Sequence, residues 1–242
     1  MPMYNSNRRK GILMKTLIKK ILDIIPVYVI FPLITIFSMQ SLIYFGTKLI
    51  NGNMEPHVLT TVIDEKTPII PLFAVIYLAC YVFWVLNYAL AGRPGKEYFY
   101  NFIMNVFIGY LISGFIFCIF PSYIERPDLQ EIPDGLGKFL MNYVYTTDTP
   151  VNVFPSMHCQ ISWYCYLAVR KQPTIPKWYQ FVSLVIAVLV CISTVVIKQH
   201  YFVDIIGGVL IAELTYRLCM TYSLGKHLSF LFEKVNKKLN LA

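Results

Sequence analysis

Long apolar blocks divide the chain and constrain its fold more than any other feature of the sequence. They are separated by short segments that carry charges, prolines or glycines. A helix needs roughly 20 apolar residues to cross a hydrocarbon core of ~30 Å, and each block has this length or nearly has it. We therefore expect an all-α polytopic membrane protein, with six transmembrane helices in one core bundle. The blocks cover residues 27–49, 68–91, 100–123, 154–170, 178–197 and 201–222.

The composition excludes several other classes of protein. Hydrophobic side chains make up 57% of the 242 residues and charged ones only 14%, which excludes disordered, fibrous and ordinary soluble domains. The net charge of +8 does not indicate a nucleic-acid partner, because Lys and Arg lie between the apolar blocks and not among exposed aromatic residues. The six cysteines lie inside or at the edges of the blocks, without CxxC pairs, so we interpret them as buried apolar residues.

The basic residues fall mostly on one side of the predicted membrane. Of 21 Lys and Arg, 16 lie before the first block, in the second and fourth connections, or near and beyond the end of the sixth block. Cytoplasmic segments retain basic residues, so we predict a cell-membrane protein with both termini in the cytoplasm. The predicted divisions are a basic segment over 1–25, amphipathic and helical over 12–25, a membrane domain over 26–223 and a basic tail over 224–242. The connection over 124–153 then faces outside.

The first candidate functional residue, Arg126, follows the third block. Pro127 disfavours helix at Arg126, so we expect an extended guanidinium at the outer surface. The five donors of a guanidinium suit a phosphate group. An arginine that faces lipid headgroups has the same features, and for Arg126 alone that is the better interpretation.

The second candidate segment runs from Asp148 to His158, where the fourth block begins. Proline is tolerated in a first helical turn, so Pro155 marks that turn and leaves the amides from Ser156 onward without intrahelical partners. Free amides at the positive end of a helix form an anion site. A capped helix with a buried histidine fits this segment about equally well.

Two pairs of ionisable residues lie four positions apart. His200 and Asp204 at the outer end of the last block share a helical face, where the carboxylate can accept the imidazole Nδ1–H and leave Nε2 as a nucleophile or base. A purely structural histidine–aspartate bond is the alternative. Glu213 and Arg217, deeper in the block, are interpreted as a charge-compensated packing pair.

Three motifs together resemble those of the type-2 phosphatidic acid phosphatase superfamily, the lipid phosphate phosphatases, over about residues 68–222. They are Arg126-Pro127, Pro155-Ser156-x-His158 and Ser193-x6-His200-x3-Asp204. The family patterns are Lys-x6-Arg-Pro, Pro-Ser-Gly-His and Ser-Arg-x5-His-x3-Asp. Departures from them stand at Ile119, Met157 and Thr194, so two cationic phosphate ligands are missing. Lys198 lies two residues before His200. A basic residue just before the His-Tyr-x-x-Asp segment resembles the sphingomyelin synthase and inositol phosphorylceramide synthase branch of the superfamily.

The resemblance implies an integral membrane lipid phosphatase that hydrolyses a phosphate monoester or diphosphate, with its active site at the extracytoplasmic face. His200 would attack phosphorus and form a phosphohistidine, Asp204 would orient it, and His158 would protonate the leaving alkoxide. The resemblance implies no metal and no cofactor. The non-bridging oxygens would be held by first-turn amides and by three side chains: Arg126, Ser156 and Lys198.

Three alternatives stay open. A phosphotransferase would pass the phosphoryl unit to a lipid hydroxyl instead of water. A channel or transporter is less consistent with the sequence, which has no inverted repeat and no charges in the middle of several blocks. His158, His200 and Asp204 could also be zinc or iron ligands, although Arg126 and Lys198 nearby favour an anion. A bis-histidine haem is less consistent still, because both histidines lie at one face.

Overall fold

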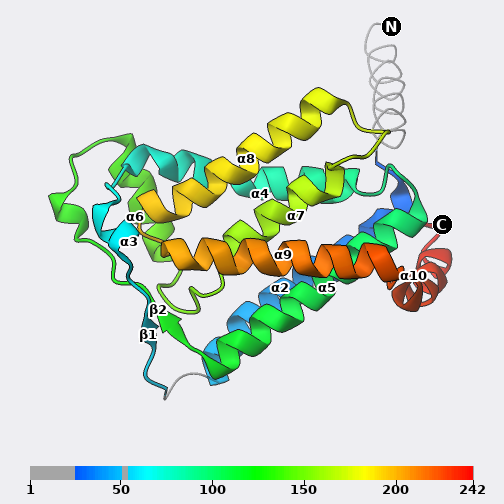
Figure 1. Ribbon diagram of the computed structural model, residues 1–242, viewed down its shortest axis with the longest axis horizontal. Coiled ribbons are helices and arrows are strands. Elements are labelled where there is room, and N and C mark those ends of the chain that lie inside the picture. The colour runs from blue at the N-terminus through cyan, green and yellow to red at the C-terminus, as the bar shows by residue number, and fades with distance from the viewer. Residues whose placement is uncertain (1–24, 51–53, 242) are drawn as a thin grey trace, which may run out of the picture.

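The computed structural model describes residues 25–50 and 54–241 and is mostly helical (Figure 1). The amphipathic helix predicted over 12–25 lies outside these residues, apart from its last position. The α-helices are α2 (Ile30–Ile50), α3 (Val62–Lys66), α4 (Ala74–Leu90), α5 (Lys96–Ile119), α6 (Leu136–Thr147), α7 (Met157–Val169), α8 (Lys177–Val196), α9 (Phe202–Tyr222) and α10 (Lys226–Lys238). Three 3-10 turns, η1 (Val27–Val29), η2 (Pro71–Phe73) and η3 (Leu129–Glu131), and two parallel strands, β1 (His57–Val58) and β2 (Ser122–Tyr123), complete the order.

Six long helices, α2, α4, α5, α7, α8 and α9, occupy the six apolar blocks. Among the described residues, four segments are long and apolar enough to span a membrane: Val27–Ile50, Pro71–Leu90, Lys96–Ile119 and Lys177–Val196. The two helices that begin at the histidine motifs, α7 and α9, are not among them, and α7 has only 13 residues. The helical membrane class is therefore confirmed, while the six-span topology and the predicted outer face stay predictions.

The bundle is organised around α7, which packs against α4, α8 and α9, while α5 packs against α2 and α9 (Figure 1). The tightest approach near the motifs lies at Gly208 of α9. A Cβ atom at this position would lie 2.5 Å from the carbonyl oxygen of Ser156, so only glycine allows α9 to lie this close to the first turn of α7. This contact fixes the two motif-bearing segments against one another.

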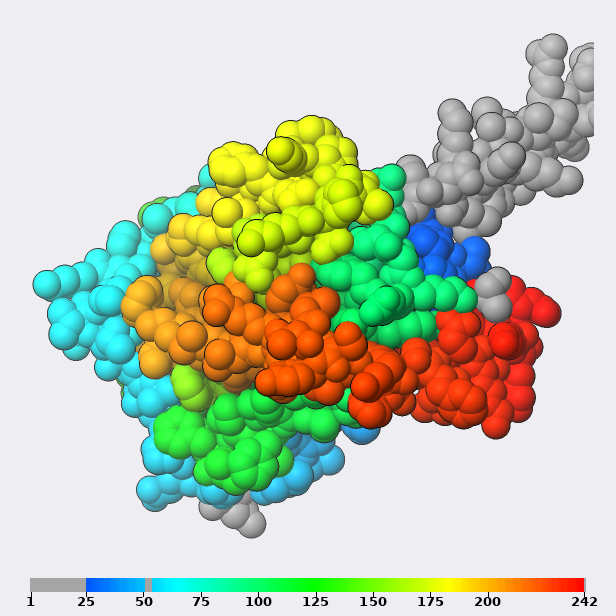
Figure 2. Space-filling view, turned by 45° about the vertical axis from the view of Figure 1, so that its right-hand side comes forward, coloured from blue at the N-terminus to red at the C-terminus, as the bar shows by residue number. Residues whose placement is uncertain are grey.

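The two ends of the bundle differ in structure. At one end α10 packs on α2 and α5, with Phe232 buried and the Asn236 amide donating to the Tyr28 carbonyl. Residues 224–242, predicted as a basic tail, thus contain a packed helix. At the opposite end lie residues 54–73, visible in cyan in Figure 2, and the connection with α6. The candidate motifs are all at this second end.

Candidate active site

His158 and His200 come together at the end of the bundle that carries α6. His158 lies in the first turn of α7, and His200 lies in the connection between α8 and α9. Their ring centroids are 5.8 Å apart. Asp204 in the first turn of α9 is fully buried beside His200. The three residues that the sequence assigns to catalysis therefore form one cluster.

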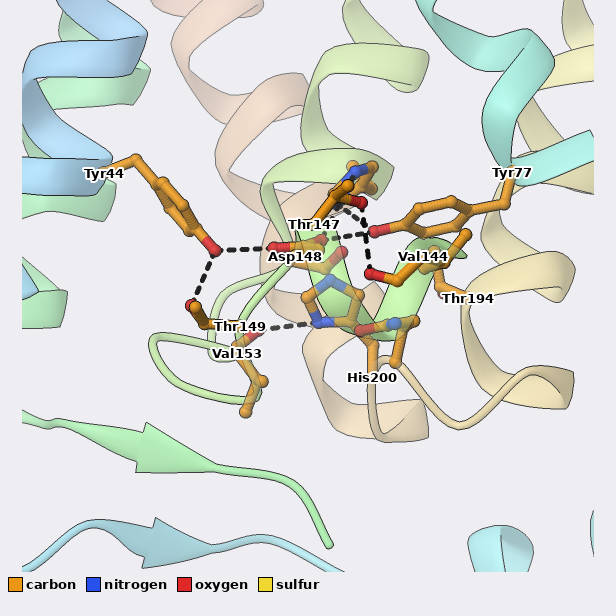
Figure 3. Close-up of polar contacts among 12 residues, drawn as sticks. Tyr44, Tyr77, Val144, Thr147, Asp148, Thr149, Val153, Thr194 and His200 are labelled. Carbon is orange, nitrogen blue, oxygen red and sulfur yellow. Dashed lines mark hydrogen bonds and ion pairs between the residues drawn. The ribbon is translucent and has the colours of Figure 1, made fainter. Parts of the chain in front are cut away.

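His200 is held by two acceptors on the same ring nitrogen. Its Nδ1 lies 3.0 Å from the carbonyl oxygen of Val153, a contact drawn in Figure 3, and 3.4 Å from Oδ2 of Asp204. Because both neighbours accept hydrogen bonds, the proton of a neutral ring belongs on Nδ1 and the lone pair on Nε2. Burial lowers the pKa of His200, but the hydrogen bond and charge of Asp204 outweigh it and hold this pKa above 6.5.

His158 faces a carboxylate of its own, that of Asp148 at the end of α6. Nε2 of His158 lies 4.0 Å from Oδ2 of Asp148 and, as a buried atom, has no hydrogen-bond partner in the described chain. The hydroxyl of Tyr77 donates to Oδ2 of Asp148 at 2.6 Å and lies 3.3 Å from Nδ1 of His158. Each histidine of the cluster thus has one aspartate near it.

Asp148 is fixed by tyrosines from two other helices. Tyr44 of α2 and Tyr77 of α4 donate to its two oxygens, each at 2.6 Å (Figure 3). Burial raises the pKa of Asp148, but the nearby His158 and the two hydroxyl donors outweigh it and hold this pKa below its usual value. The carboxylate is therefore charged at neutral pH.

Arg126 lies next to the cluster, where its two terminal nitrogens are engaged and its buried Nε has no hydrogen-bond partner in the described chain. Its guanidinium donates to the carbonyls of Tyr145 and Asp148 at 3.0 Å each and to Oε1 of Gln199 at 2.6 Å. The guanidinium also stacks on the Tyr145 ring, 4.5 Å from its centroid. In this arrangement Arg126 ties the end of α6 to the residue before His200.

The structure does not bring Lys198 to the histidines. Its Nζ donates to the carbonyls of Asp64 and Thr67 at 2.8 Å each, and so caps the end of α3. Ser156 is the N-cap of α7, where its buried hydroxyl accepts from the amide of Cys159 at 3.2 Å. Neither side chain points a free donor at the ring of His200 in this arrangement.

A cavity of about 310 Å³ opens onto both histidines. Its walls come from α2, α4, the connection after α6, the first turn of α7 and the segment before α9. Of the residues that the sequence assigns to the site, only His158 and His200 line it, and Arg126, Ser156, Lys198 and Asp204 are not among its lining residues. The other lining residues are Gln40, Ser41, Tyr44, Phe45, Tyr81, Trp84, Thr147, Asp148, Thr149, Val151, Asn152, Val153, Met157 and Gln199.

Sequence reasoning missed Asp148, Gln199 and the two tyrosines as members of the site. Asp148 begins the segment that the sequence singles out, and Gln199 is next to His200, so both could be found by proximity. Tyr44 and Tyr77 lie 104 and 71 positions from Asp148 in the chain, and no local pattern marks them. Within the described ranges, no three His, Cys, Asp or Glu side chains are grouped to hold a metal ion.

Comparisons with known proteins identify the family of the chain. The family model of the PAP2 superfamily matches residues 47–218, which contain every helix that lines the cluster except the first part of α2. The uncharacterized protein MJ0662 of Methanocaldococcus jannaschii is 26% identical over 133 residues, which are 53% of this chain and 52% of that protein. The chain thus spans about half the length of this curated relative, and no solved structure matches it significantly. The family match covers most of the chain, so the protein belongs to the type-2 phosphatidic acid phosphatase (PAP2) superfamily of phosphatase-type membrane enzymes.

Proposed function

We propose that this protein transfers the phosphoryl group of a membrane lipid through a phosphohistidine on His200, and that water is the acceptor. The observation that carries the proposal is the pair of carboxylate-supported histidines, 5.8 Å apart, at one cavity of a membrane protein. Acceptors at Nδ1 direct the lone pair of Nε2 away from Val153 and Asp204. Asp204 is thus the positioning residue for the nucleophile.

The proposed reaction has two balanced steps. In the first, Nε2 of His200 forms a bond to phosphorus, the bond from phosphorus to the lipid oxygen breaks, and protonated His158 gives that oxygen its proton. In the second, His158 takes a proton from water, the water oxygen attacks phosphorus, and the phosphorus–nitrogen bond breaks to release phosphate and regenerate His200. The first step needs protonated His158, a form that burial of the ring disfavours and that the charge of Asp148, 4.0 Å from its Nε2, favours.

The remaining task of the site is to stabilise the phosphoryl oxygens. The first turn of α7 lines the cavity through Met157 and His158, and the positive end of a helix favours an anion there. None of the three side chains that the sequence assigns to the phosphate, those of Arg126, Ser156 and Lys198, lines the cavity. We therefore place these three side chains outside the ligand set of the arrangement described here.

Transfer to a lipid hydroxyl is the second candidate function. It is favoured by the two missing motif cations, at Ile119 and Thr194, which separate this chain from the phosphatase pattern. In this case a lipid alcohol replaces water in the second step, and the proton again goes to His158. Hydrolysis and transfer share the phosphohistidine and differ in the products.

The experiment is an assay of the purified protein in lipid nanodiscs with a panel of ³²P-labelled lipid phosphates, with and without EDTA. Release of label in a water-soluble product, inorganic phosphate from a monoester or a phosphate monoester from a diester, indicates hydrolysis, whereas label in a new lipid indicates transfer. We expect turnover that EDTA does not reduce and that His200→Ala removes. His227→Ala, at an exposed histidine of α10, is the matched control and should retain wild-type turnover. Turnover retained in His200→Ala, or lost with EDTA and restored by metal, contradicts the mechanism.

A further inference from the structure

The charge of the cavity differs from what a doubly charged phosphate requires. Among the described residues that line it there is no lysine and no arginine, and the one carboxylate is that of Asp148. The two histidines are the only side chains of this lining that can carry positive charge. A phosphate monoester carries nearly two negative charges at neutral pH, so this lining leaves one of them without a fixed counter-charge.

The cations around the cavity are engaged elsewhere. Arg126 donates to three oxygens from its two terminal nitrogens and keeps one buried donor, Nε, without a partner in the described chain, although Arg126 does not line the cavity. Lys198 donates to the carbonyls of Asp64 and Thr67 at the end of α3. Nζ of Lys48 lies over the ring of Tyr44, 3.7 Å from its centroid, and Lys48 is not part of the cavity lining. Recruiting any of these to a phosphate costs interactions that the protein already makes.

The side-chain amide of Gln199 is a neutral hydrogen-bond donor in the cavity lining, whose described residues include no lysine or arginine. An arginine can only donate hydrogen bonds, so the group of the Gln199 amide that faces Arg126 must be its oxygen. Oε1 of Gln199 accepts from Arg126 at 2.6 Å, and Nε2 of the same amide therefore points away from Arg126. Gln199 is 2% exposed, lines the cavity, and has no hydrogen-bond partner for this Nε2 in the described chain. A buried donor without a partner is costly, and a phosphoryl oxygen would supply the missing acceptor.

Asp148 adds a fixed negative charge to the same lining. Two tyrosine hydroxyls hold its oxygens, and Oδ2 lies 4.0 Å from the histidine that would face the leaving oxygen. A second negative charge on the phosphate would therefore be repelled at short range.

We propose that this cavity selects a phosphate group with one negative charge, that is a lipid phosphodiester, with Gln199 as a neutral phosphate ligand and Asp148 as the residue that rejects the second charge. Arg126 is then a positioning residue, because it fixes the orientation of the Gln199 amide. The inference deepens the proposed function and rests on it for turnover, while its binding component can be measured without turnover.

The test compares two lipids that differ by one methyl group and one charge: phosphatidic acid and its monomethyl ester, phosphatidylmethanol. Both can release diacylglycerol, so kcat/KM for that product is measured for each, at a pH where phosphatidic acid carries two charges. The ratio of ester to acid is then compared between wild type and Asp148→Asn. We expect the substitution to lower this ratio by about tenfold or more, because it removes the repulsion and keeps the shape. An unchanged ratio overturns the proposal.

Asp134→Asn is the matched control, since it removes a carboxylate at the same end of the molecule, 94% exposed and outside the cavity lining. Its ratio should stay within about twofold of wild type, because water and salt screen exposed charges. A fall as large as that of Asp148→Asn would show a diffuse surface effect, which overturns the assignment to Asp148.

Binding to His200→Ala separates this inference from the proposed function and needs no folded Asp148 variant. The probes are a long-chain alkylphosphonate with two charges and its singly charged monomethyl ester, titrated in detergent by calorimetry. We expect the ester to bind at least about tenfold more tightly, and equal or weaker binding of the ester overturns the charge selection. Absence of turnover in wild type with the ester still preferred would reject the proposed function and keep the selection.

Discussion

The two ends of α7 carry polar clusters that differ in how completely their hydrogen bonds are satisfied. At one end, Glu213 of α9 accepts from Arg170 at 2.6 and 3.2 Å and from Nε1 of Trp163 at 3.0 Å, so both of its oxygens have partners. At the other end, four buried atoms in and beside the histidine cluster have none in the described chain: Nε2 of His158, Nε2 of Gln199, Oδ1 of Asp204 and Nε of Arg126.

This difference separates a structural cluster from a candidate functional one. Native proteins pair nearly all buried polar groups, so four unpaired atoms at one end of the bundle call for a missing partner. We call the Glu213 cluster closed, because both carboxylate oxygens have hydrogen-bond partners and neither is left to bind a ligand. The predicted pairing of Glu213 with Arg217 is present at 3.7 Å, with the Arg217 side chain 77% exposed, and the structure adds Arg170 as a closer partner at 2.6 Å.

The largest expected effect in this comparison is that of His200→Ala. Removing the proposed nucleophile should reduce kcat by at least about 10³-fold, because no other buried imidazole has its Nδ1 held by a carboxylate and a carbonyl among the described residues. The measurement is single-turnover release of product, together with trapping of labelled phosphohistidine at alkaline pH. Glu213→Gln, at the closed cluster, should still form the labelled intermediate.

His158→Ala should have the next largest effect, and the effect should depend on the leaving group. Loss of a general acid costs about 10²–10⁴-fold when the leaving oxygen needs a proton, as a lipid alkoxide does. A p-nitrophenyl ester has a stable leaving anion, so its turnover should fall far less. Equal losses for the alkyl and aryl esters would show that His158 is not the acid.

How much of this could be predicted from the sequence depends on the distance between partners along the chain. The helices follow from apolar blocks, and the His200–Asp204 contact follows from a four-residue spacing. The place of Asp148 in the site could not be predicted in this way, because its carboxylate is held by Tyr44 and Tyr77, whose positions are set only by how α2 and α4 pack. The orientation of Lys198 was also out of reach, because its two acceptors are backbone carbonyls more than 130 positions earlier.

The pH profile gives a smaller effect with a defined sign. His200 must be neutral to attack, and Asp204 holds the pKa of His200 above 6.5, so kcat/KM should fall as the pH drops through a value higher than 6.5. In Asp204→Asn the burial that lowers this pKa persists without the carboxylate that raises it. The acidic limb of the residual activity should therefore move to lower pH. A limb that stays in place would assign it to another group.

Glu213→Gln should change stability more than catalysis. The variant keeps the shape of the side chain but leaves Arg170 without its charged acceptor, and hydrogen bonds to charged groups contribute roughly 1.5–3 kcal/mol. We expect a lower Tm in detergent with kcat/KM within about threefold of wild type. A loss of turnover comparable to that of His158→Ala would mean that the closed cluster belongs to the active site.

Arg217→Gln should have the smallest effect, and it tests how the second cluster is built. Nε of Arg217 lies 3.7 Å from Oε2 of Glu213, and the Arg217 side chain is 77% exposed. Exposed ion pairs contribute about 0–1 kcal/mol, whereas the contact of Glu213 with Arg170 is shorter and less exposed. Combining Arg217→Gln with Glu213→Gln should therefore lower the Tm no further than Glu213→Gln alone. An additional loss in the double variant would show that Arg217 stabilises the protein through contacts independent of Glu213. A loss in Arg217→Gln alone as large as that in Glu213→Gln would make Arg217, and not Arg170, the principal partner of Glu213.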